Sequence, residues 1–267
     1  MRKGAAIAVI AIICCAAVLG VFAYKHIFPQ KTHASSTSGT SVSGSSTTLP
    51  SSNASQSSSS STISAADLSL LLLVNKDHPV PDNYDPTFMA IPISYFISSG
   101  KEDQDHFVDT AAPYIVSMID DAKKDGVKLG IVSGFRTKEY QQGLFQSHVT
   151  AAMTKGLTQT EAESSAAESV AEPGYSEHET GLAMDLGYNG SSDLTSSYEN
   201  TPAFAWLTAH AVDYGFILRY PKDKVSVTQY EYEPWHYRFV GVDNAKKIKS
   251  SGLCLEEYLE SLGISVK

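Results

Sequence analysis

Two short segments in the second half of the chain carry residue types that bind metal ions and transfer protons. Residues 176–185 read SEHETGLAMD and include His178 and Asp185, and residues 233–238 read EPWHYR and include Glu233 and His236. A catalytic zinc site takes three protein ligands with nitrogen or oxygen donors and leaves one position open for water. His178, Asp185 and His236 could supply these three ligands.

A zinc site of this kind would activate water for attack on a peptide bond. Bound zinc lowers the pKa of its water toward about 7, and a nearby carboxylate must accept the proton and pass it to the leaving amine. Glu233 is the candidate for this transfer. Glu179 is not, because the zincin pattern His-Glu-x-x-His requires a second histidine where this chain has Leu182. The spacing alone also fits a buried histidine paired with a carboxylate.

The apolar spacing predicts the elements that must position these residues. Helices are expected over residues 106–124, 137–155, 158–170, 202–214, 243–250 and 255–262, and strands or extended segments over residues 70–74, 128–133, 182–186, 216–218 and 235–240. Thr137 is the expected N-cap of the second helix, and Thr158 forms a capping box with Glu161 in the third. Helices and strands mix without strict alternation, which favours an α+β fold. We expect a small, mostly antiparallel central sheet flanked by helices, with the zinc site in a cleft.

The N-terminal part of the chain predicts a membrane anchor. Residues 5–23 are uncharged and apolar, and Arg2 and Lys3 precede them. As a helix this run would span roughly 28 Å, about the thickness of a hydrocarbon core. The positive-inside tendency places the N-terminus in the cytoplasm and the rest outside the cell. A cleaved signal peptide, or a lipoprotein signal at Cys14 or Cys15, is the alternative.

The composition between the anchor and the C-terminal part predicts a disordered linker. Residues 31–66 are rich in Ser and Thr and contain too little apolar surface to offset the entropy of ordering. We therefore expect a cytoplasmic stub and membrane anchor over residues 1–30, a linker over 31–66 and an extracellular domain over 67–267. An external domain without a disulfide framework is more usual for a bacterium with a single membrane. The net charge of −9 argues against a nucleic-acid partner, and the oligomeric state is left open.

Four segments of the chain resemble the VanY-type D-alanyl-D-alanine carboxypeptidases, which are zinc metallopeptidases that trim peptidoglycan stem peptides. They are residues 71–76 (LLLVNK, with Pro79 and Pro81 after them), 133–141 (SGFRTKEYQ), 176–185 and 233–236. The segments occur in the order found in the family and extend over residues 67 to about 240. The resemblance implies one Zn²⁺ per domain, held by His178, Asp185 and His236, with Glu233 as general base and acid.

The resemblance also implies roles for residues beyond the metal ligands. Arg136 would stabilise the scissile carbonyl as charge develops on it, or hold a substrate carboxylate, because a guanidinium is always charged and offers a planar fork of donors. Ser176 would lie near the substrate or orient the site by hydrogen bonding. Gln141 is a further substrate-binding candidate, with a plain position on the helix surface as the alternative. The implied partners are a peptidoglycan stem peptide and, through the N-terminal helix, the membrane.

The implied activity is removal of the terminal D-Ala from a stem peptide that ends in D-Ala-D-Ala. An L,D-carboxypeptidase acting on tetrapeptide stems, an endopeptidase, and a non-catalytic wall-binding module are the alternatives. A serine D,D-peptidase is disfavoured, because Ser98 and Lys101 fit Ser-x-x-Lys but the chain contains no Lys-Thr-Gly.

Overall fold

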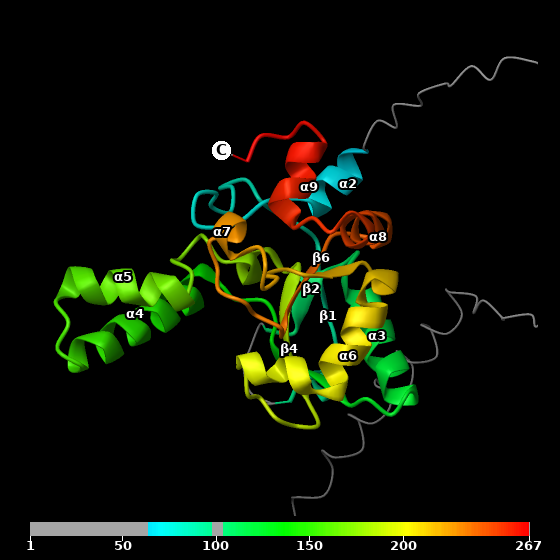
Figure 1. Ribbon diagram of the computed structural model, residues 1–267, viewed down its shortest axis with the longest axis horizontal. Coiled ribbons are helices and arrows are strands. Elements are labelled where there is room, and N and C mark those ends of the chain that lie inside the picture. Colours follow the sequence, from blue (N-terminus) through cyan, green and yellow to red (C-terminus); the bar gives the residue numbers. More distant parts are fainter. Residues whose placement is uncertain (1–63, 98–103, 267) are drawn as a thin grey trace, which may run out of the picture. The chain divides into compact units, whose positions relative to one another are not determined.

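The computed structural model describes residues 64–97 and 104–266 (Figure 1). Its α-helices are α2 (Ala65–Leu70), α3 (Ala112–Lys124), α4 (Lys138–Thr154), α5 (Gln159–Ser169), α6 (Pro202–His210), α7 (Val225–Thr228), α8 (Val242–Ser251) and α9 (Leu255–Ser261). Its strands are β1 (Phe88–Ala90), β2 (His106–Val108), β3 (Leu129–Ser133), β4 (Ala183–Tyr188), β5 (Phe216–Leu218) and β6 (His236–Phe239). Short 3-10 helices are η1 (Ile93–Tyr95), η2 (Glu177–Thr180), η3 (Ser196–Asn200) and η4 (Ala211–Tyr214).

The N-terminal predictions fall mainly outside the described residues. The expected anchor over residues 1–30 and the linker up to residue 63 belong to the part of the chain that the structure does not describe. Across residues 64–97 and 104–266, no helix has both the length and the apolar character needed to cross a membrane.

A four-stranded antiparallel sheet forms the centre of the fold. Its strand order is β3-β4-β6-β5, and a separate two-stranded antiparallel sheet consists of β1 and β2. Helices lie around the larger sheet (Figure 1). The predicted α+β architecture with an antiparallel sheet flanked by helices is therefore confirmed.

The register of this sheet brings three distant parts of the chain to one point. In β4, Asp185 pairs with Ser133 of β3 on one side and with His236 of β6 on the other. Asp185 thus lies between the end of the predicted strand 128–133 and the start of the predicted strand 235–240. Because the strands pair at these residues, their side chains meet although up to about 100 residues separate them in sequence.

Two apolar clusters hold the helices against the sheet. The larger one contains buried side chains of α3, α6, β3 and β4, among them Ile115, Met118, Leu186 and Leu207. The smaller one packs α8 and α9 against β5 and the residue that follows β6, Val240. Burial of these apolar faces is the main driving force that fixes the sheet, and therefore the site, in place.

Several predicted boundaries need correction. Residues 106–124 are not one helix: His106–Val108 form β2, and α3 begins at Ala112 with Pro113 in its first turn, where a missing N–H costs nothing. The predicted extended segment 70–74 begins at Leu70 with the end of α2. The predicted helix 202–214 ends as an α-helix at His210 and continues as η4 up to Gly215, whose φ is 81°.

Helices α4 and α5 form a hairpin that projects from the left of the view in Figure 1. Both predicted N-caps are confirmed: Thr137 accepts a hydrogen bond from the backbone N–H of Tyr140, and Thr158 forms the capping box with Glu161. The hairpin is stabilised by a small cluster around Val149 that is separate from the two main ones. The hairpin reaches the site through the first turn of α4, where Gln141 accepts a hydrogen bond from Arg136.

Candidate metal centre and active site

Three buried side chains form a cluster that could hold a metal ion. One ligand atom from each of His178, Asp185 and His236 lies within 4.8 Å of the others. Asp185 and His236 come from the paired strands β4 and β6, and His178 comes from η2, directly before β4. The structure brings together all three residues that the sequence predicted as ligands.

Gly181 allows the chain to turn from η2 into β4. Its φ is +69°, in the left-handed region that favours glycine. A Cβ atom at this position would lie 2.5 Å from Cε1 of Phe88 and 3.3 Å from the backbone nitrogen of Val108. A larger residue would therefore strain the backbone between His178 and β4 and clash with Phe88.

The hydrogen bonds of the two histidines determine which ring nitrogens face the cluster. Nδ1 of His178 lies 2.8 Å from the carbonyl oxygen of Gly134, which leaves its Nε2 3.4 Å from Oδ2 of Asp185. His236 turns its Nδ1 toward Asp185, 3.2 Å from Oδ1. Gly134 must be a glycine, because a Cβ there would clash with the carbonyl oxygen of Gln104 and lie 2.7 Å from Cζ of Phe107.

One buried carboxylate oxygen of the cluster makes no accepted hydrogen bond within the described residues. Among the described residues, Oδ1 of Asp185 has no hydrogen-bond partner with acceptable geometry. Its contact with Nδ1 of His236 at 3.2 Å is an ion pair only while that ring is protonated, and a buried carboxylate oxygen without a hydrogen bond is costly. A divalent cation among the three side chains would satisfy it, and two imidazole nitrogens with a carboxylate are a donor set that suits zinc. The residues therefore fit a zinc ion.

The electrostatics of two of the three side chains favour the protonation states that metal binding requires. Burial, together with the charge of Arg136, lowers the pKa of His178 to about 4, so its ring is neutral at pH 7. Burial alone would raise the pKa of Asp185, but His178 and His236 outweigh it and hold this pKa well below its usual range. For His236, interactions with Asp185 and Glu177 outweigh burial and raise the pKa to about 9. Metal binding must therefore displace a proton from His236.

Glu233 lies beside the cluster without being one of its members. Its Oε2 is 3.6 Å from Nδ1 of His236, and 20% of its side chain is exposed to solvent. Burial raises the pKa of Glu233 to about 7. A carboxyl group with such a pKa can both accept and release a proton near neutral pH.

Arg136 contacts the metal cluster from the side of β3. Its guanidinium donates hydrogen bonds to Oγ of Ser133 (3.1 Å), to Oε1 of Gln141 (3.2 Å) and to Oδ2 of Asp185 (3.2 Å). Gln141 is fully buried and donates its own amide N–H to the carbonyl oxygen of Ala171 at 2.7 Å. Gln141 thus lies behind Arg136 and holds it.

Ser176 lies at the start of η2. It is buried as well, and its carbonyl oxygen accepts a hydrogen bond from the backbone N–H of Glu179 at 3.0 Å. The Glu179 carboxylate accepts a hydrogen bond from the backbone N–H of Gly174 at 2.8 Å. This hydrogen bond connects the loop before η2, which contains Gly174, to η2 itself, which contains Glu179.

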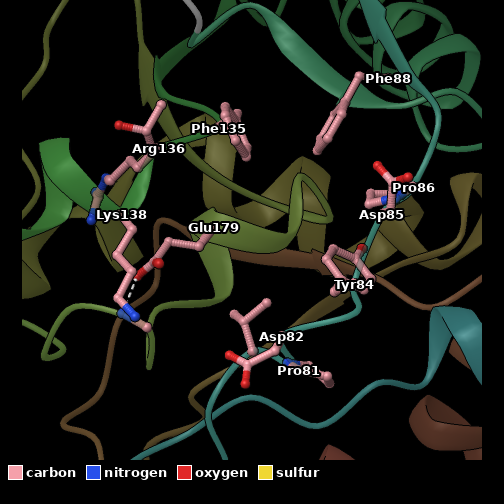
Figure 2. Close-up of a pocket in the computed structure, with 13 residues that line it drawn as sticks. Pro81, Asp82, Tyr84, Asp85, Pro86, Phe88, Phe135, Arg136, Lys138 and Glu179 are labelled. Atoms are coloured by element: carbon pink, nitrogen blue, oxygen red, sulfur yellow. Dashed lines mark hydrogen bonds between the residues drawn. The ribbon is translucent and has the colours of Figure 1, made fainter.

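A pocket of about 280 Å³ includes Arg136 in its lining, whereas the three cluster residues and Glu233 do not line it. Its lining comes mainly from two segments, residues 80–88 and 135–138, with Gly174 and Glu179. Figure 2 shows Arg136 and Lys138 on the left of this pocket and Tyr84 and Asp85 on the right. The walls thus offer charges of both signs and the aromatic rings of Phe88 and Phe135, a lining that suits a peptide.

Four charged residues next to the cluster were not singled out by their sequence pattern. They form what we call the ion-pair network: Glu177, Arg219, Arg238 and Glu256, all buried. Arg219 and Arg238 each donate to Oε1 of Glu177 at 2.7 Å, and Arg219 also donates to both oxygens of Glu256. The sequence offered one signal, an arginine (Arg238) inside β6, a strand whose four residues are all buried.

Comparisons with known proteins show to which family the chain is similar. The family model of VanY, described as D-alanyl-D-alanine carboxypeptidase, matches residues 105–242, which is just over half of the chain. The D-alanyl-D-alanine carboxypeptidase of Enterococcus faecalis is 38% identical over 192 residues, which cover 72% of this chain and 66% of that protein.

Solved structures show the same similarity. A variant of the vancomycin-resistance D,D-pentapeptidase VanY, solved in complex with Zn(II), is 38% identical with a TM-score of 0.60, covering 72% of this chain and 99% of that one. The LdcB LD-carboxypeptidase is 41% identical with a TM-score of 0.63, covering 72% and 86%. This chain belongs to the VanY family of D-alanyl-D-alanine carboxypeptidases.

Proposed function

We propose that this chain is a zinc-dependent carboxypeptidase that removes the terminal D-Ala from peptidoglycan stem peptides. The observation that carries the proposal is the buried cluster of His178, Asp185 and His236, in which Oδ1 of Asp185 lacks a hydrogen-bond partner among the described residues. The similar D,D-pentapeptidase structure in complex with Zn(II) supports zinc as the metal.

The three side chains would hold zinc through Nε2 of His178, a carboxylate oxygen of Asp185 and Nδ1 of His236. When bound, zinc supplies Lewis-acid activation of water and of the scissile carbonyl at neutral pH. The second nitrogen of His178 is fixed by the carbonyl oxygen of Gly134, which orients the ring toward the ligand position.

Glu233 is the proposed general base and acid. Its carboxylate lies next to the cluster but remains partly open to solvent, and its pKa of about 7 matches proton transfer at neutral pH. Oε2 would accept the proton of the attacking water and then pass it to the nitrogen of the leaving D-Ala.

Arg136 is the residue proposed to bind a negatively charged group of the substrate. It is tied to Asp185, yet it also lines the pocket. Its guanidinium could stabilise the developing oxyanion or hold the carboxylate of the terminal D-Ala. Gln141 would serve by orienting Arg136, and the pocket between residues 80–88 and 135–138 would receive the stem peptide.

A second candidate function is the removal of D-Ala from tetrapeptide stems by L,D-carboxypeptidase activity. The similarity to the LdcB LD-carboxypeptidase favours it, since its identity of 41% is slightly higher than that to the D,D-pentapeptidase. The metal cluster and Glu233 would act identically on both substrates, so the walls of the pocket must decide between them.

The test is to incubate the zinc-loaded full-length chain separately with a pentapeptide stem ending in D-Ala-D-Ala and a tetrapeptide stem ending in D-Ala. Release of D-Ala is followed by mass spectrometry, with the Glu233→Gln variant as the inactive control. Loss from the pentapeptide alone would establish D,D activity, and loss from the tetrapeptide alone would establish L,D activity. Loss from neither substrate, with zinc bound, would overturn the proposal in favour of an endopeptidase or a wall-binding module.

The proposed location is the outer face of the cell membrane. The apolar residues 5–23 behind Arg2 and Lys3 support an N-terminal anchor, and the Ser/Thr-rich residues 31–66 support a flexible tether. Such a tether would keep the domain of residues 67–267 concentrated near its substrate. Fractionation of cells, followed by protease digestion of intact protoplasts, would test this location.

A further inference from the structure

Glu177 occupies a buried position between the ion-pair network and the metal cluster. Its Oε1 accepts hydrogen bonds from Nε of Arg219 and from a terminal nitrogen of Arg238, both at 2.7 Å. Its other oxygen, Oε2, lies 3.4 Å from Nε2 of His236. The two oxygens of one carboxylate therefore face different neighbours, two arginines on one side and a candidate metal ligand on the other.

The two ring nitrogens of His236 face different carboxylates. Nε2 faces Glu177, and Nδ1 faces Asp185 and Glu233. The guanidinium groups of Arg219 and Arg238 both pair with Oε1 of Glu177 at 2.7 Å, so this group faces His236 as a carboxylate whose Oε2 offers only lone pairs. An ionised carboxylate can only accept hydrogen bonds, so the proton must lie on Nε2 of His236. When His236 gives up its other proton to bind a metal ion, Nδ1 is then the nitrogen that provides the lone pair.

The arginines leave Glu177 little freedom to move. Arg219 is held on its far side by two hydrogen bonds to Glu256, of 2.9 and 2.6 Å. Arg238 also donates to the carbonyl oxygens of Leu70 and Leu72, at 3.1 and 2.7 Å. The carboxylate is thus fixed from three directions by the chain around it.

We propose that Glu177 is a positioning residue of the metal centre, which fixes the orientation and tautomer of His236 so that Nδ1 binds the metal. This inference rests on the proposed zinc site. Glu177 is not one of the three clustered residues and does not line the pocket. It acts through His236, as the carbonyl oxygen of Gly134 acts through His178.

The variant Glu177→Gln tests this role with almost no change in shape. Two arginines need an acceptor, so the single amide oxygen would remain on their side and the NH₂ group would face His236. Nε2 would then have to accept a hydrogen bond, and the proton would move to Nδ1, where it blocks the metal position. We expect the affinity for zinc, measured by competition with a chromophoric chelator on the full-length chain, to fall about 10–100-fold.

Glu256→Gln is the matched control. It makes the same change from carboxylate to amide in the same network, at a residue bonded to Arg219 but in contact with neither Glu177 nor a histidine. We expect this variant to keep the zinc affinity of the wild type. Circular dichroism and thermal unfolding of all three proteins would establish that each is folded.

A measurement on the wild type avoids any loss of folding in the variants. Long-range ¹H–¹⁵N correlation spectra of the ¹⁵N-histidine-labelled, zinc-loaded chain distinguish a metal-bound ring nitrogen from a protonated one. The expected spectrum shows His236 with metal on Nδ1 and a slowly exchanging proton on Nε2. Metal on Nε2 would overturn the inference.

The outcomes separate this inference from the proposed function. A wild type that binds no zinc would overturn both. A wild type that binds zinc tightly, together with a folded Glu177→Gln variant of equal affinity, would overturn the inference alone. An equal loss of affinity in Glu256→Gln would also overturn it, because the effect would then belong to the network as a whole.

Discussion

The protein places two groups of buried charges side by side, the metal cluster and the ion-pair network, and they differ in how completely their members are paired. The network contains two arginines and two glutamates, and each carboxylate accepts at least two hydrogen bonds from a guanidinium. In the metal cluster, Oδ1 of Asp185 makes no hydrogen bond of acceptable geometry within the described residues. Its ion-pair contact is with Nδ1 of His236 at 3.2 Å, the nitrogen proposed to bind the metal. Burial of charge is common to both groups, and only incomplete pairing marks the one that can take up a ligand.

The pKa values follow the same division. In the network the pKa of Glu177 is held well below and that of Arg219 well above the usual values, so both are charged at neutral pH. Beside the metal cluster, the pKa of Glu233 is about 7 and that of His236 about 9. The paired group is therefore fixed in charge, whereas the incomplete group can exchange protons near neutral pH.

The largest expected effect comes from Glu233→Gln, which should damage chemistry without damaging the fold. Loss of the proton-transferring carboxylate should lower kcat by about 10²–10⁴-fold. Zinc content, measured by atomic absorption, should stay at that of the wild type, because Glu233 is not one of the three clustered ligands. Normal turnover by this variant would show that another group carries the proton.

Arg219→Met should have the opposite effect, damaging stability more than chemistry. It leaves the buried Glu256 without its guanidinium partner, and breaking a buried ion pair costs about 3–5 kcal/mol. The measurement is denaturant unfolding of the metal-free chain.

The double variant Arg219→Met/Glu256→Met sharpens this prediction. It removes both charges of that pair and leaves Glu177 paired with Arg238. We expect it to recover most of the lost stability, since apolar replacements of buried ion pairs are often near neutral. A double variant as unstable as Arg219→Met would contradict the interpretation of the network as a balanced set of charges.

The metal-free protein should lose stability as the pH rises from 7 to 9. The folded pKa of His236 (about 9) lies above its ordinary value of 6.5, so its contribution is complete below pH 6.5 and disappears as the pH rises through 9. With a shift of this size the loss between pH 7 and pH 9 is about 2 kcal/mol. Thermal unfolding of the metal-free chain at several pH values measures it.

Two controls accompany the pH series. His236→Asn removes the titrating ring and should flatten the curve over this range. Glu256→Gln changes only the ion-pair network and should leave the slope as in the wild type, because that network holds fixed charges. A slope that survives in His236→Asn would assign the titration to another residue.

The smallest expected effect is that of Gln141→Leu. This change removes the acceptor that Gln141 offers to Arg136 and should lower kcat/KM roughly 10-fold, since a hydrogen bond to a charged group is worth about 1.5–3 kcal/mol. Gln142→Leu is the matched control, because Gln142 is the next residue of α4 and is exposed. Equal activity of both variants would show that Arg136 does not need this support.

Local sequence signals predicted most elements near the site. Thr137 and Thr158 cap the helices that were expected to follow them, because a hydroxyl that accepts from a backbone N–H acts within one turn. The strand β3 was also predicted closely. The strand β2 was missed, because its three residues fit the helical spacing of α3 and pair only with the distant β1.

The sequence by itself determined the candidate ligands, the general base and the arginine, because residue types, their spacing and a family resemblance are all written in the chain. Only the tertiary structure decided the register that sets Asp185 between Ser133 and His236. It also decided that Gln141 supports Arg136 and that Glu177 meets Arg219 and Arg238, which lie 42 and 61 residues away. Strand pairing and burial create such contacts, and no local pattern encodes which buried charges will become neighbours.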